Sequence, residues 1–185
     1  MPATLFQIAG GFDPAIKGRL EDYELGFRLL KAGAVFQYEA KATGKHHDYT
    51  DLESWLRRRR EEGSADIIMC QQHSELANTI LNGWNEPRGK MVDSIHHMAF
   101  RGSETDDTLA RIVLQLGRFC ERFNLRGFYW RVTGVLREYY YWRGVSVGSG
   151  GRQALMRLLQ EASLPPVLSG SSLSATTSAL SRCLA

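Results

Sequence analysis

The part of the chain that follows Thr50 has the spacing of apolar residues that is typical of α-helices. The clearest series is Leu109, Ile112, Val113, Leu116 and Phe119. Intervals of three and four residues place such a series on one side of a helix. No stretch after Thr50 alternates apolar and polar residues, as a half-buried strand does. Residues 49–165 are therefore predicted to form a helical region, and the Ser- and Thr-rich tail at 166–185 is expected to be poorly ordered.

Local signals set the expected ends of these helices. Thr50 and Glu53 have the spacing of a capping box, so a helix is predicted to begin with Thr50 as its N-cap. This helix is expected to end at Gly63. The stretch 82–102 contains Gly, Pro and His residues and is predicted to be irregular. The other predicted helical segments cover 65–81, 109–119, 127–144 and 152–162.

The first 48 residues combine a helix pattern with a strand pattern. Apolar residues at helical spacing are Tyr23, Phe27 and Leu30. They predict a helix over 21–31, and Gly33 stands where a helix usually stops. Residues 34–42 alternate apolar and polar side chains, which predicts a strand. Residues 1–48 are thus expected to hold a small remnant of mixed sheet, which the helices of 50–81 cover, and the chain is assigned to the α/β class.

Charge and cysteine content argue against several function classes. The formal net charge of +3, from 23 basic and 20 acidic residues, is too small to indicate nucleic-acid binding. The three cysteines are widely spaced, without a CxxC pair, and support neither a disulfide framework nor a zinc site. No apolar run reaches the roughly 18 to 20 residues that cross a bilayer. We expect a cytoplasmic protein, peripheral to the membrane if Arg57–Arg60 bind anionic lipid, although a solvated salt-bridged face explains that run as well.

An acidic pair and a glycine pair stand out near the start of the chain. Glu21 and Asp22 begin a predicted helix, where the helix dipole stabilises negative side chains, so electrostatic capping explains them. Gly10 and Gly11 fit a plain turn. Both pairs belong to the stretch GGFDPAIKGRLEDYELGFRLLKAG, Gly10–Gly33. This arrangement resembles the family 2 glycosyltransferases of the GT-A fold in its Gly-Gly-Phe-Asp loop, its Glu-Asp pair, the acidic residue before Leu-Gly, the Arg-Leu and the closing Ala-Gly.

The resemblance implies an inverting transfer of a sugar from a nucleotide sugar to a hydroxyl of a glycan or lipid-linked acceptor. By resemblance, Asp22 is the catalytic base that takes the proton of the acceptor hydroxyl, a role that suits a positioned carboxylate. Glu21 is expected to orient the acceptor or the loop, and Gly10 and Gly11 to lie beside donor and acceptor. The implied fold is a partial GT-A-like mixed sheet followed by a helical C-terminal region.

Two adjacent histidines, His46 and His47, follow the predicted strand. Imidazole binds divalent metals, and in many GT-A enzymes a histidine at this place helps to hold Mg²⁺ or Mn²⁺. The resemblance therefore implies His46 as a metal ligand, with His47 as the alternative. A surface histidine, or one in a local hydrogen bond, explains either residue as well. The other histidines match no ligand spacing and are expected to be structural or exposed: His73, His96 and His97.

The resemblance also predicts what must act with this chain. A GT-A enzyme of this kind begins with a nucleotide-binding half that carries an Asp-x-Asp motif, and no Asp-x-Asp occurs in the sequence. We therefore expect the C-terminal part of such an enzyme, with the donor-binding half on a separate polypeptide or segment. Apolar surface exposed where that half would sit predicts self-association. The alternative function is a non-catalytic helical interaction module, peripheral to the membrane and derived from a glycosyltransferase.

Overall fold

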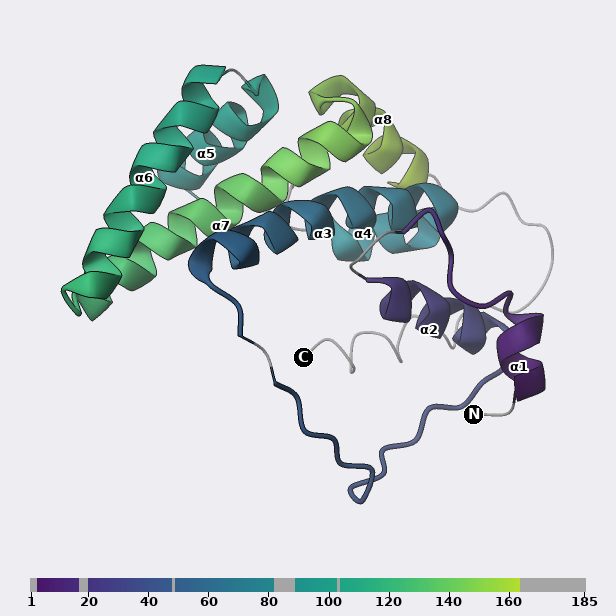
Figure 1. Ribbon diagram of the computed structural model, residues 1–185. Helices are drawn as coiled ribbons and strands as arrows, with labels where there is room; N and C mark the ends of the chain where they lie inside the picture. Colours follow the sequence, from purple (N-terminus) through teal and green to yellow (C-terminus); the bar gives the residue numbers. More distant parts are fainter. Residues whose placement is uncertain (1–2, 17–19, 48, 82–88, 103, 164–185) are drawn as a thin grey trace.

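Helices account for all the regular secondary structure in the part of the chain that the structure describes. The computed structural model (Figure 1) describes residues 3–16, 20–47, 49–81, 89–102 and 104–163. No strand occurs in these ranges. The described part is therefore all-α, and the prediction of an α/β fold with a mixed-sheet remnant is wrong. The tail predicted at 166–185 lies outside the described residues.

The helices follow one another in the order α1 to α8, with a short 3₁₀ helix η1 after α3. Their bounds are α1 Ala3–Ile8, α2 Glu21–Lys31, α3 Leu52–Gln72, η1 Ser74–Leu76, α4 Ala77–Ile80, α5 Lys90–Arg101, α6 Glu104–Arg122, α7 Arg126–Ser149 and α8 Arg152–Ser163. α2 has the predicted bounds. α5 lies inside the stretch that was predicted to be irregular, of which residues 82–88 are outside the described part. No helix among the described residues is long and apolar enough to cross a bilayer.

The segment predicted as a strand, 34–42, is irregular and loops away from the helices (Figure 1). Its apolar side chains Val35 and Tyr38 are exposed. Its backbone makes local turn bonds, such as that from the Ala42 amide to the Glu39 carbonyl (3.0 Å). A stable strand needs neighbouring strands and a surface that covers its apolar side. The described part of the chain supplies neither at this segment, so the alternation did not lead to a strand.

The long helix α3 begins one residue later than predicted and does not stop at Gly63. Asp51, not Thr50, is the N-cap, and its Oδ1 accepts a hydrogen bond from the Ser54 amide (2.7 Å). The helix continues through Gly63 to Gln72. A glycine inside a helix costs about 1 kcal/mol relative to alanine. Here that cost is offset because α3 needs a residue without a side chain where it meets α7.

Helices α3 and α7 cross with their backbones in close contact. A Cβ atom added at Gly63 would clash with the Tyr141 carbonyl, and one added at Gly144 would clash with the Arg60 carbonyl. Ser64 strengthens the crossing, because its Oγ donates a hydrogen bond to the Gly144 carbonyl (3.0 Å). Small residues on both helices therefore fix how closely and at which positions the two longest helices pack.

Helix α7 is the centre of the fold, with α3, α5, α6 and α8 packed around it (Figure 1). The main core consists of apolar residues from these helices and α4, among them Ile67, Cys70, Leu81, Ala99, Tyr139, Trp142, Val145 and Leu155. On the other side of α3, Phe27 of α2 is buried with Met69 and Leu76. This smaller cluster attaches α2 to the end of α3. Tyr23, on the predicted apolar face of α2, is exposed instead.

Candidate functional site

The Gly-Gly loop, α2 and the end of α3 meet around the guanidinium of Arg28. Its Nε and Nη2 donate to the two carboxylate oxygens of Glu24, both at 2.6 Å. The same side chain reaches back to the loop, where Nη2 donates to the Gly11 carbonyl (2.6 Å) and Nη1 to the Ala9 carbonyl. A bidentate pair of this kind is among the strong interactions in proteins. One arginine thus fixes the loop against the helix.

Glu24 is the buried member of this network, with 1% of its surface exposed. His73, which follows α3, places its Nε2 3.0 Å from the Glu24 Oε1. Burial disfavours the charged carboxylate, but the hydrogen bonds from Arg28 and His73 outweigh it and hold the pKa of Glu24 below its ordinary value. The His73 ring also stacks edge-on against Phe27, with ring centres 4.8 Å apart. His73 therefore anchors α2 to α3, which agrees with the structural role expected for it.

The Gly-Gly loop takes the backbone conformation that glycine permits. Gly10 and Gly11 have φ angles of 82° and 68°, a left-handed region that other residues adopt at a cost. The loop then turns at Asp13, whose carboxylate accepts from the Ala15 amide (2.7 Å) and from Gln72 Nε2 (2.6 Å). These two bonds hold the pKa of Asp13 below its ordinary value. The loop is therefore tied to α3 at one end and to α2 at the other.

An open pocket of about 310 Å³ lies beside this loop. Its lining includes Gly10, Phe12, Asp13, Glu24, Arg28 and His73. The two carboxylates of its described lining, Asp13 and Glu24, are already hydrogen-bonded within the protein. The pocket can present backbone and cationic groups to a polar ligand, but its acids are occupied in holding the fold.

The two acids predicted to act on the acceptor stand at the start of α2. Asp22 is exposed, and its Oδ1 accepts a hydrogen bond from the Tyr23 amide (2.9 Å). Glu21 is half-buried, and its Oε2 is a buried oxygen without a hydrogen-bond partner among the described residues. Neither residue is among the described residues that line the pocket. The structure thus places Gly10 and Gly11 near Glu24 and not near Asp22. The role of Glu24 in holding the loop was not predicted, although its i, i+4 spacing to Arg28 is visible in the sequence.

The histidines predicted to bind a metal are both exposed, in the irregular segment after α2. His46 and His47 make no cluster with other ligands: in the described ranges, no three His, Cys, Asp or Glu residues are placed to hold one ion. Divalent metals in proteins are held by several such ligands at once. The described residues around His46 and His47 therefore do not fit a metal site. Asp48 lies outside the described part.

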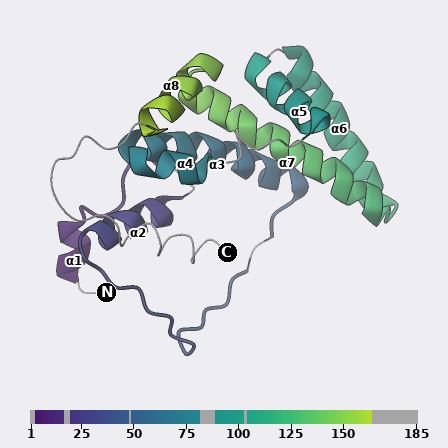
Figure 2. The same ribbon diagram turned by 180° about the vertical axis from the view of Figure 1, so that it is seen from behind.

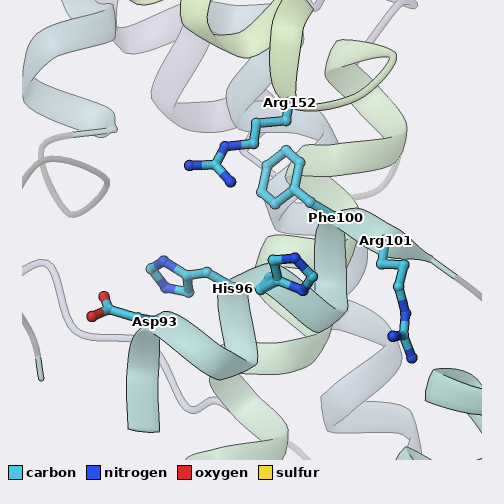
Figure 3. A pocket seen from close by; sticks show the side chains of 6 residues that line it. Asp93, His96, Phe100, Arg101 and Arg152 are labelled. Atoms are coloured by element: carbon cyan, nitrogen blue, oxygen red, sulfur yellow. The ribbon is translucent and has the colours of Figure 1, made fainter. Parts of the chain in front are cut away.

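A larger open pocket, of about 740 Å³, lies between α5 and α8 (Figure 3). Figure 3 shows Arg152 above Phe100, while the side chain of Arg101 is directed away from them. Arg101 instead donates two hydrogen bonds to the buried Asp106, at 2.9 and 2.7 Å. His96 is buried at the base, with its ring 4.4 Å from that of Trp142. These are core interactions, and they explain this side of the pocket without a ligand.

Comparison of the chain with protein-family models, with curated proteins and with solved structures gave no match. The likeness to family 2 glycosyltransferases therefore rests on the sequence alone, mainly on the stretch Phe6–Gly63. Within that stretch, the structure assigns a clear physical task to Glu24 and Arg28. It leaves Asp22 accessible at the helix start.

Proposed function

We propose that α1, α2 and the Gly-Gly loop form the acceptor side of an inverting, nucleotide-sugar-dependent glycosyltransferase, in which Asp22 is the base. The observation that supports this proposal is the Glu24–Arg28 pair. Both residues belong to the stretch that resembles the family, and together they hold the backbone of Gly11 against the helix that carries Asp22. An enzyme that joins two substrates needs its substrate-binding loop and its catalytic base held in a fixed relative position.

In the proposed reaction, the acceptor hydroxyl oxygen attacks the anomeric carbon, the bond from that carbon to the diphosphate breaks, and the nucleoside diphosphate leaves. The Asp22 carboxylate takes the hydroxyl proton as the new bond forms. A carboxylate in water is a weak base, with an ordinary pKa near 3.9. We therefore expect the donor-binding polypeptide to cover Asp22 when the substrates are bound. That separate half would also bind the nucleotide, and the divalent cation remains a prediction for the assembled enzyme.

The test is release of nucleoside diphosphate from UDP-, GDP- and dTDP-sugars, with the purified chain alone and with the donor-binding half of a family 2 glycosyltransferase. We expect turnover in the mixture, and a loss of about 10²- to 10⁴-fold in Asp22→Asn, the usual contribution of a general base. Asp93→Asn is the matched control, because Asp93 is also an exposed aspartate in the first turn of a helix. The proposal is wrong if no donor is turned over in any combination, or if Asp22→Asn retains the wild-type rate.

The second candidate function, a non-catalytic helical interaction module, is favoured by one observation. Helix α6 exposes large apolar side chains on its outer side, including Ile112 and Phe119. Surfaces of this kind mark interaction sites. Saturable binding of a nucleotide sugar by the chain, weakened by Asp22→Asn, would count against this candidate.

A further inference from the structure

Helix α6 has apolar residues on two sides, and the described part of the chain covers only one of them. Ala110, Leu114 and Cys120 are buried. A second series is exposed: Leu109, Ile112, Leu116, Phe119 and Phe123. Their spacing of three, four, three and four residues places them along one face, which we call the outer face of α6. Their exposed fractions run from 43% for Leu109 to 60% for Ile112.

The outer face leads to the tip of the hairpin that α6 forms with α7. Figures 1 and 2 show that the two helices meet at a corner of the molecule, away from α1 and α2. The ring of Phe119 on α6 lies 4.5 Å from the ring of Phe123, the residue that follows α6. The first turns of α7 expose two more rings, Phe128 and Trp130. Four exposed aromatic side chains therefore gather at this tip.

The part of the hairpin on either side of its tip is positively charged. From Thr108 to Arg131 the sequence has five arginines and one glutamate, a formal charge of +4, whereas the whole chain has +3. All of these arginines are exposed: Arg111, Arg118, Arg122, Arg126 and Arg131. Arg118 pairs with Glu53 of α3. The positive charge is thus concentrated around the tip of the hairpin, beside the exposed apolar face.

We propose that the outer face of α6 and the hairpin tip bind the surface of an anionic phospholipid bilayer. An amphipathic helix with Phe, Trp and Leu on one face and arginines beside them lies in the plane of the interface, with its apolar face between the headgroups and the acyl chains. The arginines gain attraction from anionic headgroups. Aromatic rings such as Trp130 favour the headgroup level.

Other occupants fit the surface less well. A second copy of the chain would bring a second positively charged hairpin to the same contact, and like charges repel. A single-stranded nucleic acid binds through aromatic rings that stack on bases. The outer face is aliphatic over its first half, at Leu109, Ile112 and Leu116, so it offers no such rings there.

Two arginines of the basic run Arg57–Arg60 are engaged within the protein. Arg59 pairs with Glu62 and lies over the ring of Tyr141, 5.1 Å from its centre. Arg58 donates to the Thr50 hydroxyl (2.8 Å). These contacts agree with a salt-bridged face. The hairpin, and not this run, is the surface that we assign to lipid.

The test is co-sedimentation of the full chain with vesicles of phosphatidylcholine alone and with 30% phosphatidylglycerol. We expect binding to the anionic vesicles that weakens as salt is raised from 0.05 to 0.5 M, because salt screens the arginines. Ile112→Ser/Phe119→Ser should weaken binding at least tenfold. Arg122→Gln/Arg126→Gln should weaken it about fivefold for each arginine, on anionic vesicles only. All four side chains are exposed, so circular dichroism should show an unchanged fold.

Matched controls change exposed residues of the same kind elsewhere. Val35→Ser/Tyr38→Ser removes exposed apolar side chains of the irregular segment, and Arg57→Gln/Arg157→Gln removes two exposed arginines. Both should bind vesicles as the wild type does. The proposal is overturned if the chain ignores anionic vesicles, or if the hairpin variants bind as well as the controls. If the chain does not bind vesicles but forms dimers that Ile112→Ser/Phe119→Ser abolishes, the face belongs to a second copy of the chain. If it does not bind vesicles but binds a single-stranded oligonucleotide through the hairpin, the face belongs to nucleic acid.

Discussion

Replacing Arg28 with methionine should release α2 and the Gly-Gly loop from the end of α3. Methionine keeps an unbranched apolar stem but removes the guanidinium and every hydrogen bond that it makes. Glu24 is then left buried, with His73 as its remaining partner. The carbonyls of Ala9 and Gly11 lose the donor that now holds them.

The expected cost follows from these contacts. Removing one partner of a buried ion pair costs about 3 to 5 kcal/mol, and each lost hydrogen bond about 1 kcal/mol. The Arg28 side chain is 23% exposed, so water can reach the carbonyls that it leaves. We therefore expect about 3 kcal/mol in the free energy of opening of α2. Glu24→Gln/Arg28→Met removes the stranded charge and should recover most of this loss.

The pH dependence of stability should have opposite signs in the wild type and in Arg28→Met. In the wild type the pKa of Glu24 is lowered, so its contribution to stability is present above pH 4.5 and is lost as the pH falls through the folded pKa. Without Arg28, burial dominates and raises this pKa, so the variant should lose stability as the pH rises above 4.5. The difference between the two proteins should therefore be larger at pH 7 than at pH 4.

Hydrogen exchange of the α2 amides, read by mass spectrometry, measures this opening directly. Lys31→Met is the matched control on the same helix, because it removes the exposed pair with Glu75 (2.9 Å) and should cost less than 1 kcal/mol. If Arg28→Met costs no more than Lys31→Met, or if the double variant is less stable than Arg28→Met, the buried network does not hold α2 in place.

Two further changes test the α3–α7 core. Burial raises the pKa of Asp66 to about 6, although the Tyr141 hydroxyl donates to it (2.6 Å), so its ionisation costs the wild type up to about 3 kcal/mol as the pH rises from 4 to 8. Asp66→Asn should gain that amount over the wild type across this range in urea unfolding, and a constant difference would contradict the assignment. Gly144→Ala should lower stability by more than 2 kcal/mol, because the added methyl group meets the Arg60 carbonyl. Gly134→Ala should raise stability by about 1 kcal/mol, because nothing lies within 4 Å of the methyl group added there. Similar effects of the two changes would exclude a close crossing of α3 and α7.

The parts of the fold that were predicted correctly depend on local signals. α2 ends where Gly33 follows it, and α8 extends one residue past its predicted end. The strand at 34–42 was mispredicted because pairing depends on distant segments. Gly63 was taken as a helix end because its contact with α7 lies far away in the sequence. α5 was missed because the glycine, proline and histidine residues of the stretch 82–102 outweighed the helical spacing of Ile95 and Ala99, which are both buried.

In the candidate site, too, local features were predictable and contacts between distant segments were not. Glu24 and Arg28 are spaced i, i+4 in the sequence, and in the structure they form a bidentate contact. Its connection to His73, which lies 49 residues further along, depends on the fold. The position of Asp22 at the start of α2 was predictable from the sequence. The pocket beside the Gly-Gly loop was not. Spacing identifies partners within a helix, but it cannot show which distant helix completes them.

The glycine contact between α3 and α7 fixes the distance between two parts of the molecule. Backbones that touch without long side chains between them cannot slide by a change of rotamer, so the two helices keep one relative position. The hairpin tip lies near the beginning of α3, and His73 follows its end (Figure 1). With 21 residues at 1.5 Å each, α3 separates the two by about 30 Å. A surface that holds the tip therefore also sets how far the Gly-Gly loop stands from its point of attachment.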